Sequence, residues 1–345
     1  MVVVMRAGAT QEEIDGVCSM IESHELEPLL MPGSVMAIGI PSAIPTDLRD
    51  PLQQQLEILP GVSRVSQVSR SYKLASREFH PESTVVDIGD VRFGGDEIVV
   101  MAGPCSIESY EQLRLAAEIV KEDGAQVLRG GAFKPRTSPY AFQGLAAEGL
   151  EIMKRVGEEV GIKTVSEVMS PDMVGLVAEH VDILQIGARS MQNFPLLIEA
   201  GKSGHPVMIK RGPSATIDEF LLAAEYLLAH GNNKVLLCER GVHPLDRTYT
   251  RNTLDLSAVP VLKEISHLPV VVDPSHGVGV AKYVPTMACA AVAAGADALM
   301  VEVHPNPREA VSDAAQTLAP PAFQAMMEKL AAFAPVAGRT IRSGA

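Results

Sequence analysis

The sequence predicts an α/β protein in which a (β/α)8 barrel, the TIM-barrel fold, follows a small ferredoxin-like α+β domain. Eight short runs of strand-forming residues, each followed by an amphipathic helical segment, lie between residues 97 and 340. The first 70 residues instead follow the order β-α-β-β-α-β. The chain has 345 residues, which suits a barrel of about 250 residues and one small extra module.

The first domain, residues 1–70, has clear helix and turn signals. Thr10 and Glu13 have the spacing of a capping box at the head of an amphipathic helix. A Pro-Gly pair separates the second and third strands. Strands are expected at 2–5, 29–31, 35–40 and 62–68, and the second helix near 48–59. This order is the ferredoxin-like pattern, and such domains commonly bind small ligands or mediate oligomerisation.

Residues 71–96 are expected to link the two domains and to cap the barrel. Strand-forming runs at 85–88 and 91–93 flank Gly89 and Asp90, as in a β-hairpin. An apolar hairpin directly before the first barrel strand can plug the bottom of a barrel.

The barrel itself is expected over residues 97–340. Its strands are predicted at 98–102, 127–129, 163–168, 183–186, 207–210, 234–238, 270–273 and 299–302. An open doubly wound sheet usually stops at five or six strands, so eight repeats favour closure.

Polar residues follow nearly every one of these strands. In such barrels the chemistry lies at the carboxyl ends of the strands. The basic residues there are Arg129, Lys134, Arg136, Arg189, Lys210 and Arg240. Their mutual repulsion would cost roughly several kcal/mol unless anions neutralise them. Because arginine suits carboxylate and phosphate, the cluster predicts a site for two anionic substrates or one bisphosphate.

A second set of side chains has metal-binding chemistry. Cys105, His276 and Glu302 lie at three strand ends, and Asp313 follows in the loop after the last strand. A thiolate, an imidazole and two carboxylates suit Zn²⁺, Mn²⁺, Fe²⁺ or Co²⁺. His304 is a rival ligand, and a nucleophilic Cys–His pair is an alternative that spacing leaves open.

Composition excludes several classes of function. A net charge of −13 provides no positive field for nucleic acid. The sequence has neither a signal peptide nor a run of about 18 apolar residues that could span a membrane. We therefore expect a cytoplasmic protein without nucleic-acid or membrane partners. The four cysteines are too scattered for a disulfide framework, although Cys238, at a neighbouring strand end, is a candidate disulfide partner of Cys105.

The strings at these strand ends resemble those of the type Iβ 3-deoxy-D-arabino-heptulosonate 7-phosphate (DAHP) synthases. The resemblance covers essentially the whole chain, including the first domain and the connector Tyr72–Pro81. The matching pieces are Gly103-Pro-Cys-Ser106, Leu128-Arg-Gly-Gly131, Lys134-Pro-Arg-Thr-Ser138, Gly187-Ala-Arg189, Cys238-Glu-Arg-Gly241, Asp273-Pro-Ser-His276, Val301-Glu-Val-His304 and Ser312-Asp313.

The resemblance implies a tetrameric enzyme of aromatic amino acid biosynthesis. The reaction is the first step of the shikimate pathway, which condenses phosphoenolpyruvate with erythrose 4-phosphate and water to give DAHP and phosphate. One divalent metal ion (Mn²⁺, Fe²⁺, Zn²⁺ or Co²⁺) is implied. The residues that match the family's metal ligands are Cys105, His276, Glu302 and Asp313.

The resemblance also implies roles for the basic residues. Arg189 and Arg240 match the site for the phosphate of phosphoenolpyruvate, and Arg129 and Lys210 match the site for its carboxylate. The full predicted phosphoenolpyruvate site is Arg129, Lys134, Ala188, Arg189, Lys210 and Arg240. The predicted site for the phosphate of erythrose 4-phosphate is Arg136, Thr137 and Ser138. The predicted catalytic residues are Lys134 as the acid, Glu167 as the holder of the attacking water, and His276.

Two alternatives come from the same resemblance. The sister enzyme 3-deoxy-D-manno-octulosonate 8-phosphate synthase uses arabinose 5-phosphate, but its loop after the second strand is of the Lys-Ala-Asn-Arg type. A chain whose main role is amino-acid sensing is the other, since relatives with this extension are often inhibited by aromatic amino acids. Here Leu29-Leu30-Met31-Pro32 stands where hydrogen-bonding side chains would be expected, which favours a role of the first domain in assembly.

Overall fold

The structure is a computed structural model that describes residues 1–345 except 32–34, 68–70, 135–139, 141, 343 and 345. It divides into two compact units. The first comprises Met1–Glu82 and Ile265–His267, and the second comprises Ser83–Glu264 and Leu268–Ala345. The domain boundaries expected after residues 70 and 96 stay predictions.

The first unit contains a four-stranded antiparallel sheet in the order β2-β3-β1-β4. Its elements are β1 (Val2–Met5), α1 (Gln11–Glu22), β2 (Leu29–Met31), β3 (Ala37–Gly39), α2 (Thr46–Glu57) and β4 (Val62–Ser66). The capping box at the start of α1 is present, because Glu13 N donates to Thr10 Oγ1 (3.3 Å) and Thr10 N donates to Glu13 Oε2 (2.8 Å). The ferredoxin-like fold of this segment is confirmed.

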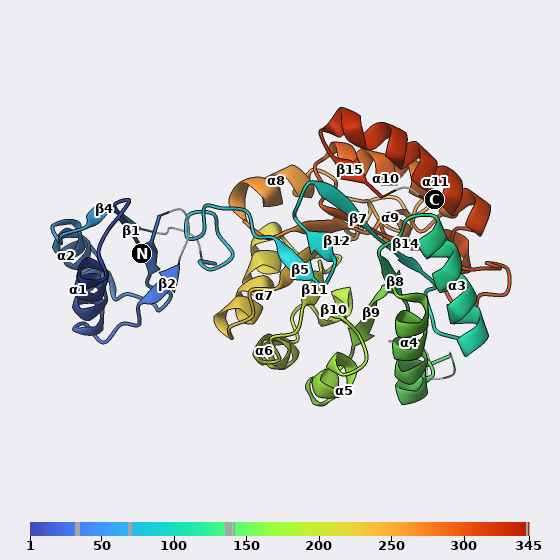
Figure 1. Cartoon of the computed structure of the whole chain (residues 1–345), viewed down its shortest axis with the longest axis horizontal. Helices are drawn as coiled ribbons and strands as arrows, with labels where there is room; N and C mark the ends of the chain where they lie inside the picture. Colours follow the sequence, from blue (N-terminus) through green and yellow to red (C-terminus); the bar gives the residue numbers. More distant parts are fainter. Residues whose placement is uncertain (32–34, 68–70, 135–139, 141, 343, 345) are drawn as a thin grey trace. The chain divides into compact units, whose positions relative to one another are not determined.

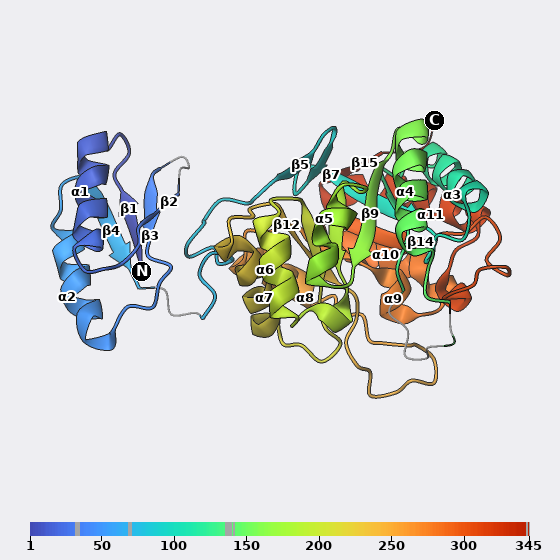
Figure 2. The ribbon, with the colours of Figure 1, turned by 90° about the horizontal axis from the view of Figure 1, so that it is seen from below.

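Both helices of this unit pack on the same face of the sheet (Figure 2). Ile14, Val17 and Ile21 of α1 belong to one buried cluster with Leu52 and Leu56 of α2. The sheet contributes its inward-facing side chains to the cluster, which are Val3, Met5, Ile38, Val62 and Val65. Burial of this apolar surface holds the domain together.

The second unit contains the closed barrel of eight parallel strands that the sequence predicts (Figure 1). Its strands are β7 (Glu97–Gly103), β8 (Val127–Arg129), β9 (Lys163–Val168), β10 (Ile183–Ile186), β11 (Val207–Lys210), β12 (Val235–Glu239), β13 (Val270–Val272) and β14 (Ala298–Glu302). Each strand pairs with the next, and β14 pairs back with β7 from Ala298↔Val99 to Glu302↔Gly103. These pairings close the barrel.

Helices follow the strands around the outside of the barrel (Figure 1). They are α3 (Tyr110–Glu122), α4 (Ala146–Val160), α5 (Val174–Ala178), α6 (Phe194–Lys202), α7 (Ile217–Ala229), α8 (Ala258–Ile265), α9 (Pro274–Val278), α10 (Val284–Ala293) and α11 (Pro320–Phe333). Short 3₁₀ turns occur at Pro171–Met173, Ala188–Ser190, Ala281–Tyr283, Ala314–Gln316 and Ala334–Ala337, and β15 (Thr340–Ile341) pairs with the start of β7.

The hairpin of β5 (Val86–Ile88) and β6 (Val91–Phe93) packs against the barrel interior. Its Val86, Ile88, Val91 and Phe93 share one buried cluster with inward residues of the barrel strands. Figure 2 shows this hairpin at the opposite end of the barrel from the long loop between β12 and α8. The carboxyl ends of the strands are therefore left open for a site. Across the described residues, no helix has the length and apolar character needed to cross a membrane.

Candidate active site and metal centre

A cavity of about 490 Å³ lies at the carboxyl ends of the barrel strands. We call it the mouth. It is lined by Arg129, Lys134, Glu167, Gln185, Gly187, Ala188, Arg189, Lys210, Pro213, Arg240, His243, Arg247, Arg251, Asn252, His276 and Asp313. The strands thus bring together five of the predicted basic residues, both predicted catalytic partners of Lys134, and one predicted metal-binding carboxylate.

Three of these cations are deeply buried in the mouth. The exposed fractions of Arg129, Lys210 and Arg240 are 5%, 4% and 9%, and a buried charge is costly unless it is neutralised. Arg129 Nη1 donates to Glu302 Oε1 at 2.8 Å, and Lys210 Nζ donates to Asp273 Oδ2 at 2.7 Å.

Arg240 differs from the other two cations. Burial lowers its pKa, although the nearby carboxylate of Asp273 acts in the opposite direction. Among the described residues, no carboxylate lies within 4.0 Å of its guanidinium. A buried guanidinium without a neighbouring carboxylate suits an incoming anion.

The predicted metal ligands come together in part. The ligand atoms of Cys105, Glu302 and Asp313 all lie within 4.8 Å of one another. The Cys105 thiol donates to Asp313 Oδ2 at 3.1 Å. His276 lies outside this tight group but borders it, because its Nε2 is 3.4 Å from Glu302 Oε1.

His304, the rival ligand, points to a different carboxylate. Its Nε2 lies 3.4 Å from Glu108 Oε2, and its Nδ1 accepts the backbone N–H of Asn306. It is not part of the described group that can hold an ion.

Asp273 orients two functional side chains at once. Its Oδ2 accepts from His276 Nδ1 at 2.8 Å and from Lys210 Nζ, while its Oδ1 accepts from the His276 backbone N–H at 2.9 Å. Burial alone would raise its pKa, but His276 and Lys210 hold that pKa well below the ordinary value. When His276 is neutral, its hydrogen bond to Asp273 favours the proton on Nδ1, and the lone pair of Nε2 then faces the side of Glu302.

The protonation of the ligand set follows from its surroundings. Burial, followed by the neighbouring Glu302 carboxylate, raises the pKa of Cys105 to about 11. Burial acts to raise the pKa of Asp313, but the hydrogen bond from Cys105 and the charge of His276 outweigh it and lower that pKa to about 2. These directions agree with the hydrogen bond that the Cys105 thiol donates to the Asp313 carboxylate.

Lys134 and Glu167 lie at different parts of the mouth. Lys134 Nζ donates to Cys105 Sγ at 2.8 Å and to Cys105 O at 3.0 Å. Glu167 Oε2 accepts from Gln185 Nε2 at 3.2 Å. The Glu167 carboxylate packs against the backbone at Gly187. A Cβ atom at position 187 would lie 2.0 Å from Glu167 Oε1, so a larger residue there would displace the carboxylate.

Two further predictions concern the erythrose 4-phosphate site and a disulfide between Cys105 and Cys238. Arg136, Thr137 and Ser138, the predicted erythrose 4-phosphate site, lie outside the described residues. Cys105 and Cys238 are both free thiols in the structure.

The loop between β12 and α8 brings His243, Arg247 and Arg251 to the mouth, which sequence reasoning missed. Arg251 Nη1 donates to Asp313 Oδ1 at 3.2 Å. The available signal was two arginines in one long loop of an acidic protein.

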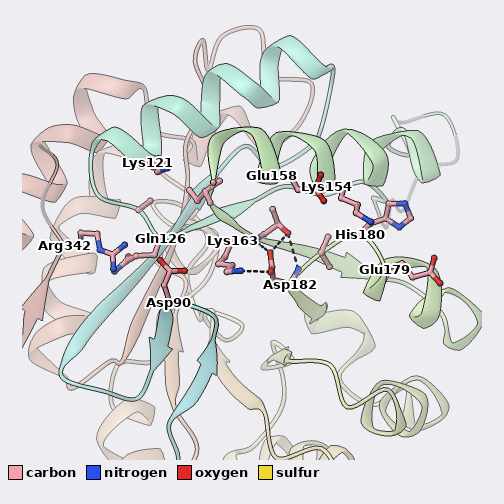
Figure 3. A pocket seen from close by; sticks show the side chains of 16 residues that line it. Asp90, Lys121, Gln126, Lys154, Glu158, Lys163, Glu179, His180, Asp182 and Arg342 are labelled. Atoms are coloured by element: carbon pink, nitrogen blue, oxygen red, sulfur yellow. Dashed lines mark hydrogen bonds and ion pairs between the residues drawn. The ribbon is translucent and has the colours of Figure 1, made fainter.

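A second cavity, of about 500 Å³, lies at the amino ends of the strands (Figure 3). Two of its lysines have nearby acceptors. Lys163 Nζ is 3.3 Å from Asp182 Oδ1, and Lys121 Nζ donates to Val160 O. Four acidic residues line it beside its cations, which are Asp90, Glu158, Glu179 and Asp182. Its charges therefore do not converge on an anion site.

Comparison with known proteins identifies relatives over the full length of the chain. Phospho-2-dehydro-3-deoxyheptonate aldolase of Thermotoga maritima is 45% identical over 338 residues, which cover 98% of this chain and 99% of the relative. The crystal structure of that Thermotoga maritima enzyme, a DAHP synthase, matches with a TM-score of 0.78 and 44% identity over 99% of both chains. A 2-dehydro-3-deoxyphosphooctonate aldolase of Bradyrhizobium diazoefficiens is more distant, at 32% identity over 72% of this chain and 94% of its own.

Two family models match the chain, one over its first 70 residues and one over the barrel. Residues 1–70 match the DAHP synthase ferredoxin-like domain. Residues 73–334 match the DAHP synthetase I family. With that match over most of the chain and a relative of 45% identity along nearly its full length, the chain belongs to the DAHP synthetase I family.

Proposed function

We propose that the mouth condenses phosphoenolpyruvate with erythrose 4-phosphate and water to form DAHP and phosphate, the first step of the shikimate pathway. One observation carries this proposal. Three side chains that could hold a metal ion (Cys105, Glu302 and Asp313) and three buried cations (Arg129, Lys210 and Arg240) occupy one barrel end. The first can activate a carbonyl group, and the second can bind an anionic partner for it.

Phosphoenolpyruvate binds to the cations of the mouth. Arg129 and Lys210 bind its carboxylate, held in place by Glu302 and Asp273. Arg240, which has no described carboxylate partner, binds its phosphate together with Arg189 and the adjacent Ala188. Desolvation of these cations strengthens their attraction for the anion.

The donor set fits one divalent transition-metal ion. A thiolate, two carboxylates and an imidazole with its Nδ1 held by Asp273 match the ligands and the outer contacts of such sites. Cys105, His276, Glu302 and Asp313 would hold the ion, which is one of Mn²⁺, Fe²⁺, Zn²⁺ or Co²⁺. When bound, the ion supplies Lewis acidity toward the aldehyde oxygen of the sugar phosphate.

The chain's own residues handle the protons and the water. C3 of phosphoenolpyruvate forms a bond to the aldehyde carbon, and the resulting alkoxide takes its proton from Lys134 Nζ. Glu167 orients the water that adds to the cationic C2. One proton of that water replaces the proton that Lys134 gave to the alkoxide, and the other leaves with phosphate when the C2–O bond breaks and the C2 carbonyl forms. The position of Lys134 Nζ at 2.8 Å from Cys105 Sγ supports this role, because it keeps the ammonium beside the metal ligands.

The identity of the sugar phosphate is supported by sequence comparison. Arg136, Thr137 and Ser138 are assigned to its phosphate by resemblance alone. The DAHP synthase ferredoxin-like domain and the higher identity to the heptonate aldolase favour erythrose 4-phosphate over arabinose 5-phosphate.

The direct experiment measures phosphate release from phosphoenolpyruvate. Erythrose 4-phosphate should support release and arabinose 5-phosphate should not, and EDTA should abolish activity that added Mn²⁺ restores. A preference for arabinose 5-phosphate would reject the assigned substrate, and full activity after chelation would reject the metal. A Lys134→Met protein of normal kcat would reject Lys134 as the acid.

We further propose a cytoplasmic homotetramer in which the first domain serves assembly. Leu29 and Leu30 on edge strand β2 are 39% and 46% exposed, an apolar surface that suits a protein contact better than an amino-acid site. Sedimentation measures the mass of the assembly. Initial rates with millimolar tyrosine or phenylalanine test the alternative, because inhibition would show that this domain senses amino acids.

A further inference from the structure

The loop that carries Asp313 joins β14 to the following 3₁₀ turn and covers residues 303–313. Asp313 itself has φ +53° and ψ +30°, in the left-handed region that non-glycine residues rarely adopt. A residue in this conformation keeps it only when its surroundings hold it there. The contacts of this loop therefore decide where the Asp313 carboxylate lies.

The loop after β7, which carries Cys105, is the partner of the Asp313 loop. Ser106 Oγ and Ser312 Oγ are 2.6 Å apart and buried. Glu108 lies two residues farther along and makes two more contacts. Its Oε1 accepts the backbone N–H of Val311 at 3.0 Å, and its Oε2 faces His304 Nε2 at 3.4 Å.

The two Glu108 contacts need two acceptor oxygens. Because His304 Nδ1 accepts the Asn306 N–H, the proton of the neutral ring is on Nε2. That buried Nε2 makes no hydrogen bond within the described part of the chain, and Glu108 Oε2 faces it at 3.4 Å. The Val311 N–H donates to Oε1 of Glu108, and His304 Nε2 faces Oε2 of the same carboxylate, whose side chain is only 18% exposed. One carboxylate thus holds both ends of the loop.

We infer that Glu108 is a positioning residue for the metal centre: it ties His304 and Val311 together and thereby fixes the Asp313 carboxylate beside Cys105. This inference rests on the proposed metal site. It also gives His304 a role other than that of a rival ligand. Glu108 acts through Asp313 and touches neither the substrates nor the ion.

The test is a Co²⁺ titration of the metal-stripped full-length protein, followed by the cobalt–thiolate absorption band. Glu108→Ala should weaken Co²⁺ binding by up to about 10-fold, the lower end of the loss caused by removing a direct partner of a metal ligand, because Glu108 acts one contact farther out. Glu108→Gln should have a smaller effect, since the amide keeps one acceptor oxygen. Glu111→Ala, an exposed position in the first turn of α3, is the matched control and should bind like the wild type.

A double substitution separates positioning from general damage. In an Asp313→Ala background, Glu108→Ala should cause no further loss of Co²⁺ affinity, because the residue through which it acts is gone. Additive losses in the double variant would overturn the inference, as would a Glu108→Ala protein with wild-type affinity. Should the alanine variant not fold, wild-type affinity of Glu108→Gln would overturn it instead. Absence of a cobalt–thiolate band in the wild type would reject the metal centre itself, a different result from any of these.

Discussion

Replacement of Asp273 by asparagine tests how the mouth holds its ligands. The carboxylate is fully buried and accepts hydrogen bonds from His276 Nδ1, His276 N and Lys210 Nζ. Asparagine has nearly the same shape but only one oxygen. Its NH₂ group must therefore face a donor: the His276 backbone N–H if it takes the place of Oδ1, or both Lys210 Nζ and His276 Nδ1 if it takes the place of Oδ2.

The expected losses follow from these contacts. Lys210 loses its buried counter-ion, which costs about 3–5 kcal/mol of stability. For a domain of this size that lowers Tm by roughly 6–20 °C. If the new amide donates to Nδ1, the ring proton moves to Nε2, and Nε2 can no longer bind an ion. Metal affinity should therefore fall by roughly 10- to 100-fold.

Calorimetry and Co²⁺ titration measure the two effects separately. Asp218→Asn, at an exposed position in the first turn of α7, should change neither. The reasoning is refuted if Asp273→Asn binds Co²⁺ within twofold of the wild type and melts at the same temperature. A lower Tm with unchanged metal affinity would show that Lys210 needs its counter-ion but that Asp273 does not set the tautomer of His276.

Three further outcomes are expected. Because the pKa of the Cys105 thiol is raised to about 11, the thiol is protonated near neutral pH and must lose its proton when the metal binds. Co²⁺ affinity should therefore rise about tenfold per pH unit near neutrality, and a pH-independent Kd would contradict this. Gly187→Ala should lower kcat, because the added Cβ would lie 2.0 Å from Glu167 Oε1, whereas Gly175→Ala in α5, where a Cβ meets nothing within 4 Å, should not, as steady-state kinetics can show. Phe93→Ala, in the hairpin that fills the barrel floor, should lower the free energy of unfolding by about 3–5 kcal/mol in urea titrations; a loss below about 1 kcal/mol would mean that the floor repacks.

The fold was predictable because each barrel strand has a strong local signal. Each observed barrel strand begins and ends within about one residue of the run of strand-forming residues that predicted it. The capping box fixed the start of α1 for the same reason, since its two hydrogen bonds join residues three apart. In contrast, β15 (Thr340–Ile341) has only two residues, and it exists because Thr340 and Ile341 pair with Glu97 and Ile98. Such a short strand has no periodicity to detect.

The site was predictable only to the extent that strand ends determine it. Arg129 and Lys210 end their strands, so the barrel closure places both in the mouth. Arg251 lies in an irregular loop, and its contact with Asp313 depends on the path of that loop. The dual role of Asp273 was also hidden, because it requires the relative positions of β11 and β13, which are not adjacent strands.

The contacts of the mouth join its two predicted functions into one electrostatic unit. Each predicted metal ligand interacts with a cation: Cys105 with Lys134 at 2.8 Å, Glu302 with Arg129 at 2.8 Å, and Asp313 with Arg251 at 3.2 Å. His276 follows the same pattern through Asp273, which it shares with Lys210. Burial strengthens the attractions of Arg129 for Glu302 and of Lys210 for Asp273, because little water screens them, whereas the partly exposed pair of Arg251 and Asp313 is screened more. Since Arg129 and Lys210 are also the proposed ligands of the substrate carboxylate, a change at a metal ligand alters the charge that holds a substrate-binding cation. The proposed carboxylate site and the metal site therefore cannot be adjusted independently.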